Sequence, residues 1–218
     1  MILALDTSSD MLGLALHDGR RLLWESSWPV RLRHTVELAP AVKGVMDQTG
    51  AKVKDLVAVA VTLGPGSFTA LRIGIAFAKG LALASTMKII GLRTLDVLVR
   101  AQIPRKEPLA AVLETGRRGV AAAVYQYSED SWKEISPPKI YRWPELVESI
   151  PRRGRVCGEI GEEGRALLQH RRDLKILPGS WSLRRAGHLA EAAWEKFLAG
   201  EATPSEDLAP LYLNTAGA

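Results

Sequence analysis

Residues 57–84 constrain the fold of this chain more than any other segment, because a strand, a glycine turn and a helix follow one another directly. Val57–Leu63 is an apolar run typical of a strand in the centre of a sheet. Residues 64–67 read Gly-Pro-Gly-Ser, and from about Thr69 to Ala84 the apolar pattern continues as a helix. A buried strand that leads straight into a helix indicates an α/β fold.

The glycine turn can be interpreted in two ways. It can be a rigid connection with Ser67 or Thr69 as the N-cap, or it can bind a phosphate at the N-terminus of the helix. The sequence lacks the third glycine of a GxGxxG motif and the Gly-Lys-Ser/Thr of a P-loop, and a proline in the turn removes one amide donor. We therefore favour a structural turn, formed by Gly64, Pro65, Gly66, Ser67 and Thr69.

The helix after the turn is apolar on almost all sides. Within residues 70–84 only Arg72 and Lys79 are charged, and Gly74 and Gly80 lie in the interior. A glycine inside a helix costs about 1 kcal/mol relative to alanine. A helix with two of them and so few polar residues is expected to be buried on more than one side, within its own domain or against a helix of another chain.

The rest of the first hundred residues surrounds this unit with a mixed sheet and further helices. The apolar patterns predict strands at 2–6, 12–16, 22–28 and 89–92 and helices at 32–48 and 94–101. Pro40 lies inside the first of these helices, so we expect either a kink or a helix that begins near Leu38.

The pattern restarts after the breaker-rich segment 103–108. A strand at 109–114 ends in Glu114 as the first strand ends in Asp6, and the same shift of 108 positions superposes Trp24 on Trp132. We interpret this as an internal duplication and predict two lobes, 1–102 and a smaller 103–218. In the second lobe we expect strands near 119–127, 132–141, 155–157 and 174–177, and an edge strand at 209–214. We expect helices near 144, 162–170 and 182–200. The helix at 182–200 is expected to pack near the lobe junction.

Charge and composition narrow the class of protein. The net charge is +5, from 29 Lys and Arg against 24 Asp and Glu, and much of the excess lies in arginine pairs. The pairs are Arg20–Arg21, Arg117–Arg118, Arg152–Arg153, Arg171–Arg172 and Arg184–Arg185. They could contact phosphates, but we favour solvated surface corners, because no aromatic residues alternate with them.

The sequence also indicates a cytoplasmic protein with no membrane association. The N-terminus has no basic region before its apolar run, and no apolar run reaches the length of a membrane-spanning helix. A single cysteine, Cys157, excludes an internal disulfide and a cysteine-clustered metal site.

Few residues stand in a pattern that carries chemistry. Asp6, Thr7 and Ser8 could hold a metal-bound water and a phosphate, or Asp6 and Ser8 could satisfy backbone donors in the turn. His34 has Leu38 where a second histidine would complete a metal pair, so we interpret it as a capping or surface residue. A GxSxG elbow and a Cys–His pair are also absent from the sequence. We therefore predict no catalytic residue and no metal site.

Four segments together resemble the TsaB family, also called YeaZ. They are ILALDTSS at the start, the RxxHT motif at 31–35 that leads into the first helix, VTLGPGSFTALRIGIAFAKGLA at 61–82 and PLYLN near the end. The resemblance implies an actin-like (ASKHA) fold with two ribonuclease-H-like lobes. It also implies a role with TsaD, TsaE and ATP, in which a threonylcarbamoyl group is placed on the adenosine beside the anticodon of tRNA.

The resemblance further implies a subunit without catalysis of its own. TsaD is the catalytic paralogue and carries a metal-binding histidine pair, of which this chain keeps only His34. We expect no cofactor of its own, ATP used by the complex, a TsaD-like partner, a TsaE-like ATPase, tRNA bound through the complex, and a homodimer when the partner is absent. Asp6, Thr7, Ser8 and Glu114 would be degenerate nucleotide-facing residues. The expected partner interface comprises Leu32, Val36, Ala39, Leu71, Arg72, Gly74, Ile75, Ala78 and Lys79.

Two other functions stay open as alternatives. One is an ATP-dependent phosphotransferase in which Asp6 and Glu114 flank metal-bound phosphates. The other is a glycoprotease-type peptidase, for which the sequence has no histidine pair, cysteine nucleophile or serine elbow.

Overall fold

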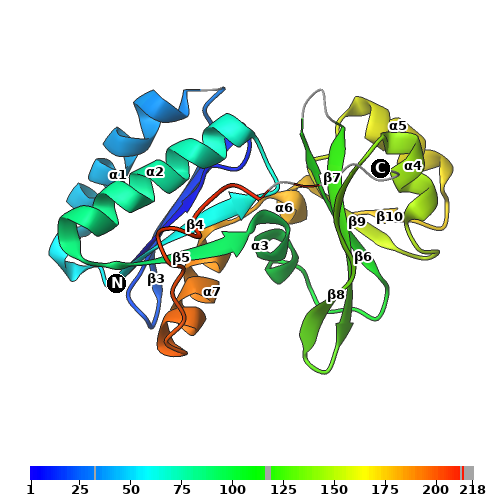
Figure 1. Ribbon diagram of the computed structural model, residues 1–218. Coiled ribbons are helices and arrows are strands. Elements are labelled where there is room, and N and C mark those ends of the chain that lie inside the picture. The colour runs from blue at the N-terminus through cyan, green and yellow to red at the C-terminus, as the bar shows by residue number, and fades with distance from the viewer. Residues whose placement is uncertain (32, 116–118, 212, 214–218) are drawn as a thin grey trace. The chain divides into compact units, whose positions relative to one another are not determined.

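Two sheets of five strands organise the chain (Figure 1). The computed structural model describes residues 1–31, 33–115, 119–211 and 213. Residues 1–97 and 185–211 form the first unit, and residues 98–184 form the body of the second.

The first sheet has the strand order β3-β2-β1-β4-β5. Its strands are β1 (Ile2–Asp6), β2 (Met11–His17), β3 (Leu22–Pro29), β4 (Ala58–Gly64) and β5 (Lys88–Arg93). The pairs β1–β2 and β2–β3 are antiparallel, whereas β1–β4 and β4–β5 are parallel. The four strands predicted at 2–6, 12–16, 22–28 and 89–92 and the buried strand at 57–63 are therefore confirmed.

Two helices pack on the leucine-rich face of this sheet. They are α1 (His34–Thr49) and α2 (Phe68–Ser85), and a short 3-10 turn, η1 (Val53–Asp55), precedes β4. Ile75 and Ala78 of α2 join Leu3 and Leu5 of β1 in one apolar cluster. α1 begins at His34 and continues through Pro40, so the predicted late start near Leu38 is wrong.

The opposite face of the first sheet is lined by alanines and is covered by α7 (Ala186–Leu198). Ala4 and Ala60 of the sheet lie in one cluster with Ala190 and Ala193 of the helix. Small side chains on both surfaces allow the helix to pack closely against the sheet, which buries apolar area that α7 could not bury alone.

The packing of α7 changes the predicted domain boundary. Residues 185–211 return to the first unit, so assigning all of 103–218 to the second lobe is wrong for this segment. The division between the units also falls within α3 (Thr94–Arg100), at residues 97–98 and not at 102–103. The helix predicted at 182–200 is two helices, because α6 (Gly179–Ser182) ends before α7 begins.

The chain after α7 runs back along the first sheet. The amide of Thr203 donates to the carbonyl of Ile89 at 2.8 Å, and the amide of Leu211 donates to the carbonyl of Leu63 at 2.7 Å. Residues 209–211 form no strand, contrary to the edge strand expected at 209–214, and Tyr212 and Asn214 lie outside the described residues.

The second sheet repeats the order of the first, read as β8-β7-β6-β9-β10. Its strands are β6 (Leu109–Glu114), β7 (Val120–Ser128), β8 (Ser131–Tyr141), β9 (Arg155–Gly158) and β10 (Lys175–Ile176), and its helices include α4 (Trp143–Ser149) and α5 (Glu162–His170). Trp143 packs in an apolar cluster with Leu146 and Leu168, which joins α4 and α5 to the sheet. The elements predicted for this region are confirmed, apart from the helix at 182–200 and the strand at 209–214.

The two units have the same topology. Asp6 ends β1 and Glu114 ends β6, and Trp24 and Trp132 lie in the corresponding strands β3 and β8. The internal duplication inferred from the shift of 108 positions is thus confirmed, together with the α/β actin-like fold of two ribonuclease-H-like units.

A pH-dependent ion pair fixes the loop after α5. Both carboxylate oxygens of Asp173 accept hydrogen bonds from the Arg171 guanidinium, at 2.8 and 2.9 Å. These bonds hold the pKa of Asp173 well below its ordinary value. A carboxyl group with a lowered folded-state pKa stabilises the protein above its unfolded pKa of about 3.9, and this contribution is lost as the pH falls through the folded pKa.

Replacing Asp173 with asparagine is therefore expected to lower the melting temperature at neutral pH. The difference in melting temperature between the variant and the wild type should narrow as the pH falls below about 4, because the unfolded wild-type chain then takes up a proton at this carboxyl group while the folded chain still keeps it ionised. Thermal unfolding followed by circular dichroism between about pH 7 and 2.5 measures the gap. A gap that stays constant over this range would contradict the assignment.

Candidate functional site

The Asp6 carboxylate at the end of β1 is buried and serves the turn that follows it. Its Oδ1 atom accepts hydrogen bonds from the Ser8 amide at 2.9 Å, the Ser8 hydroxyl at 2.5 Å and the Thr62 hydroxyl at 3.2 Å. Asp6 is 2% exposed, and Thr7 and Ser8 are fully buried. The carboxylate thus ties the β1–β2 turn to β4, as expected if Asp6 and Ser8 satisfy donors within the turn.

The glycine turn after β4 packs directly on the same residues. The Ser67 amide donates to the Ser8 carbonyl at 2.7 Å, so this donor at the start of α2 is already engaged. A Cβ atom on Gly66 would lie 2.2 Å from the Ser8 carbonyl oxygen, and one on Gly74 would lie 2.3 Å from Thr7 Oγ1. Both glycines are therefore required for close contact between this turn and the β1–β2 turn.

The predicted N-cap is correct in position only. Ser67 precedes α2, but its hydroxyl makes no capping hydrogen bond, and Thr69 lies within the helix. Pro65 follows Gly64, whose φ of +115° is a left-handed conformation suited to glycine. The turn is rigid and internally packed, which supports the structural interpretation.

The second unit uses its strand-end carboxylate in a comparable way. Glu114 Oε1 accepts a hydrogen bond from the Gly161 amide at 2.9 Å, directly before α5. A Cβ atom on Gly161 would lie 2.3 Å from the same oxygen. Glu114 thus occupies the N-terminal end of α5, where the helix dipole favours a negative charge. Residues 116–118, which include the arginine pair Arg117–Arg118, lie outside the described residues.

His34 has a structural role that was not predicted from the sequence. The side chain is 1% exposed, and its Nε2 atom lies 3.0 Å from the Ser9 carbonyl oxygen. Because a carbonyl oxygen only accepts, Nε2 carries the proton and donates it. His34 therefore connects the start of α1 to the β1–β2 turn, and its assignment as a capping or surface residue is wrong. Over residues 1–31, 33–115, 119–211 and 213, no group of three or more His, Cys, Asp or Glu side chains is arranged to hold a metal ion.

The predicted partner interface divides into buried and accessible residues. Leu71, Gly74, Ile75 and Ala78 are buried within the first unit, so the prediction that they contact a partner is wrong. The helix is apolar on nearly all sides, and the sequence pattern therefore did not indicate which side faces the sheet. Leu32 lies outside the described residues.

The accessible part of the prediction lies on the outer surface of α1 and α2. Val36 and Ala39 of α1 and Arg72 of α2 are exposed, and Lys79 is half-buried. Arg72 lies over the ring of Phe68, with its Cζ atom 3.6 Å from the ring centroid. Whether these four residues contact a partner stays a prediction.

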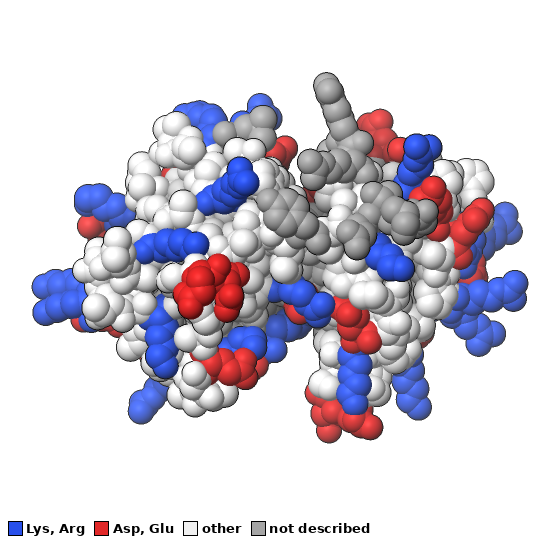
Figure 2. Space-filling model, in the orientation of Figure 1, with Lys and Arg blue, Asp and Glu red and all other residues white. Residues whose placement is uncertain are grey.

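The outer face of α2 is apolar, and the side chains in its middle are small. Ala76 and Gly80 are exposed, and a Cβ atom added at Gly80 would meet no atom within 4 Å. Leu83 at the end of the helix is 89% exposed, and Val36 on α1 is 60% exposed. In Figure 2 the surface over α2 is largely uncharged, with isolated basic side chains. This outer face, defined by Val36, Ala39, Arg72, Ala76, Gly80 and Leu83, can accommodate a closely packed helix.

In the part of the chain that the structure describes, α2 is also the one helix long and apolar enough to cross a membrane. Core helices of soluble proteins meet the same criterion. Because Leu71, Ile75 and Ala78 are buried inside the first unit, we interpret α2 as a core helix with one free face.

Comparison with known proteins supplies the family. A model of the family TsaD, tRNA N6-adenosine threonylcarbamoyltransferase, matches residues 30–159. The tRNA threonylcarbamoyladenosine biosynthesis protein TsaB of Escherichia coli strain K12 is 31% identical over 222 residues, which cover 97% of this chain and 94% of that protein. The chain belongs to the TsaB family.

Two further TsaB-family relatives agree with this assignment. TsaB of Bacillus subtilis strain 168 is 29% identical over 163 residues, or 74% of this chain and 71% of that protein. The solved structure of YeaZ from Pseudomonas aeruginosa superposes with a TM-score of 0.79 at 25% identity and covers 97% of this chain and 99% of that one. The resemblance to the TsaB family is thus confirmed over nearly the whole chain.

Proposed function

We propose that this TsaB-family chain is a non-catalytic subunit that binds a TsaD-like subunit through the outer face of α1 and α2. With a TsaE-like ATPase and ATP, the pair supports transfer of a threonylcarbamoyl group to the adenosine beside the anticodon of tRNA. We expect the chain to act in the cytoplasm. ATP is used by the complex, and the chain itself binds no cofactor.

The observation that carries the proposal is the outer face of α2. Ala76 and Gly80 leave room for the backbone of a second helix, and Leu83 and Val36 offer apolar side chains at the edges. A face of this kind buries apolar area when a partner covers it. Arg72 is exposed in the same stripe and can pair with a carboxylate at the rim of the contact.

The TsaD family match supports a TsaD-like partner. The matched residues 30–159 include α1 and α2, so a TsaD-like protein is expected to carry related helices at the same place in its own fold. Related surfaces can pair around an approximate two-fold axis. The same geometry lets two copies of this chain form a homodimer through α1 and α2 when the partner is absent.

The contacts of the carboxylates at the ends of β1 and β6 support a non-catalytic role. Asp6 and Glu114 accept hydrogen bonds from the chain itself, and the Ser67 amide donates to Ser8. A nucleotide site of the chain's own would need these groups for phosphate or for a metal-bound water.

The test is reconstitution of tRNA modification from purified subunits. We expect the TsaD-like subunit to co-purify with this chain, and modified adenosine to disappear when the chain is omitted and return when it is added. Unchanged modification without the chain would overturn the proposal.

Single substitutions on the outer face are expected to weaken the heterodimer. Ala76→Glu and Leu83→Glu should each raise the dissociation constant about tenfold, because each places an unpaired charge against the partner helix. Calorimetry or light scattering with the TsaD-like subunit measures the change. Leu198→Glu is the matched control, since Leu198 is 70% exposed on α7 of the same unit and should leave affinity unchanged. Wild-type affinity in both test variants would show that the interface lies elsewhere.

A further inference from the structure

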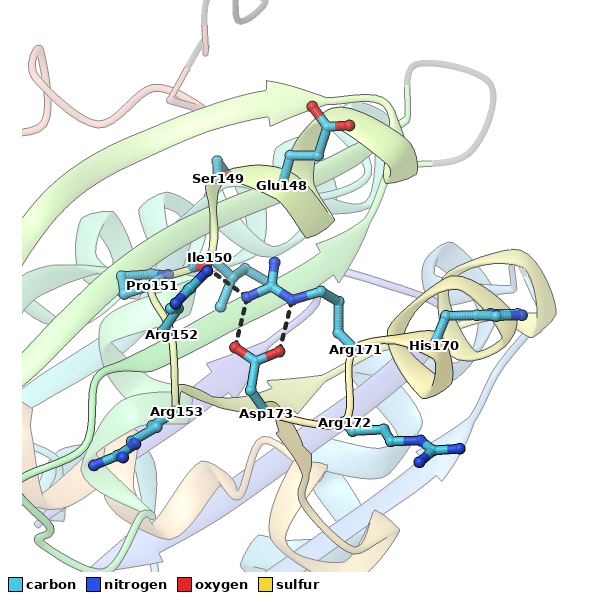
Figure 3. A pocket seen from close by; sticks show the side chains of 10 residues that line it. All are labelled: Glu148, Ser149, Ile150, Pro151, Arg152, Arg153, His170, Arg171, Arg172 and Asp173. Carbon is cyan, nitrogen blue, oxygen red and sulfur yellow. Dashed lines mark hydrogen bonds and ion pairs between the residues drawn. The ribbon is translucent and has the colours of Figure 1, made fainter.

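A basic groove in the second unit has no part in the proposed contact through α1 and α2. Its volume is about 880 Å³, and it lies where the end of α4 meets the loop between α5 and β10 (Figure 3). The ten residues that line it are Glu148, Ser149, Ile150, Pro151, Arg152, Arg153, His170, Arg171, Arg172 and Asp173. Two of the arginine pairs noted in the sequence, Arg152–Arg153 and Arg171–Arg172, thus meet in one groove.

Arg171 and Asp173 form a fixed base for the groove. Besides its two bonds to Asp173, the Arg171 guanidinium donates through Nη1 to the Val147 carbonyl at 2.7 Å and through Nη2 to the Ile150 carbonyl at 3.4 Å. Arg171 therefore links the end of α4 to the loop after α5, and Asp173 is already neutralised by it.

The groove carries a net positive charge. Four arginines stand against two carboxylates, Glu148 and Asp173, which gives a net charge of +2 with His170 counted as neutral. Arg152, Arg153 and Arg172 are exposed. Figure 3 shows Arg153 and Arg172 extending outward on opposite sides of Asp173, while Arg171 points toward it. A ligand that spans the groove can meet a guanidinium on either side.

We propose that this groove binds the phosphate backbone of RNA, and in the proposed function that of the tRNA substrate. Arginine forms bidentate hydrogen bonds with phosphate oxygens, and several arginines spaced along a groove match the regular charges of a strand. No Phe, Tyr or Trp is present among the ten described lining residues, so bases would find no stacking platform there. The contact would be made to the backbone and would position the tRNA without reading its sequence.

The inference rests on the proposed function for the identity of the RNA, and the experiment separates the two. Binding of an unmodified tRNA transcript to the full-length chain, and to the heterodimer with the TsaD-like subunit, is measured by fluorescence anisotropy at several salt concentrations. The test variant is Arg152→Gln/Arg153→Gln/Arg172→Gln, which leaves the Arg171–Asp173 base intact. The control variant is Arg105→Gln/Lys139→Gln/Arg165→Gln, which removes the same charge from exposed positions outside the groove. Circular dichroism and thermal unfolding check that each variant is folded, and binding to the TsaD-like subunit is measured separately.

We expect the test variant to bind the transcript about tenfold more weakly at low salt and to lose about 2 from the slope of log K against log salt, while the control variant stays near wild type. Binding of the test variant to the TsaD-like subunit should be unchanged. The proposed function would therefore stand even if the groove proved not to bind RNA. Inorganic phosphate should compete only at far higher concentrations than the transcript, because it engages one site and not a strand.

Three outcomes would overturn the inference. They are no transcript binding by the wild-type proteins, equal losses in the two triple variants, and a test variant that loses the TsaD-like subunit while keeping the transcript. The last result would identify the groove as a surface for an acidic protein segment.

Discussion

Gly74→Ala is expected to lower the free energy of unfolding by about 2–3 kcal/mol, whereas Gly80→Ala, six residues along the same helix, is expected to raise it by about 0.5–1 kcal/mol. Alanine favours a helix over glycine at both positions, so the opposite signs come from packing alone. At Gly74 the new methyl group would lie 2.3 Å from Thr7 Oγ1 and 3.1 Å from Thr7 Cγ2. At Gly80 it would point into open space.

The measurement is urea unfolding of the isolated chain, repeated at several protein concentrations because self-association would add apparent stability. The pair of variants is its own control, since helix propensity contributes equally to each. A stabilised Gly74→Ala variant would mean that α2 does not rest on the β1–β2 turn. A heterodimer assay adds a second readout, because Gly80 lies on the proposed contact and Gly74 does not.

Asp6→Ala is expected to cost about 3 kcal/mol of stability, and it also tests the alternative function of a phosphotransferase. The substitution removes the acceptor of the Ser8 amide, the Ser8 hydroxyl and the Thr62 hydroxyl, all of which are buried. A buried donor left without a partner costs about 1–3 kcal/mol, and rearrangement of the hydroxyls recovers part of the sum. Asp10→Ala is the matched control, because Asp10 is exposed in the same turn, and its effect should stay within about 0.5 kcal/mol.

Calorimetry with ATP and magnesium on the same proteins distinguishes a structural carboxylate from a catalytic one. If Asp6 only holds the turn, the variant loses stability and the wild-type chain has no tight nucleotide binding to lose. Tight binding in the wild type that disappears in a stable Asp6→Ala variant would favour the actin-like phosphotransferase.

Local sequence patterns were sufficient to predict most of the elements of this fold. The order of strands and helices, the glycine turn and the restart at Leu109 all follow from apolar periods and breakers within a few residues of one another. The match of Asp6 with Glu114 and of Trp24 with Trp132 in the sequence predicted the duplication. The prediction was correct because the two residues of each pair lie in corresponding strands.

Features that depend on distant partners were not predictable in this way. The alanines of α7 are compatible with many surfaces, and only the alanine-lined face of the first sheet, more than a hundred residues earlier, explains why the helix returns to it. His34 looked like a surface residue because its acceptor, the Ser9 carbonyl, comes from another turn. The groove at Arg171 likewise needs two segments that meet only in the folded unit.

Residues 57–84 illustrate the division between sequence and tertiary structure most clearly. The amino-acid pattern alone predicts a buried strand, a rigid glycine turn and an apolar helix here, because backbone freedom and hydrophobic period are local properties. The folded structure is needed to show that Leu71, Gly74, Ile75 and Ala78 face inward and that Ala76, Gly80 and Leu83 face outward. A helix that is apolar all round has no strong preference for one face, so its orientation is set by the surface on which it packs.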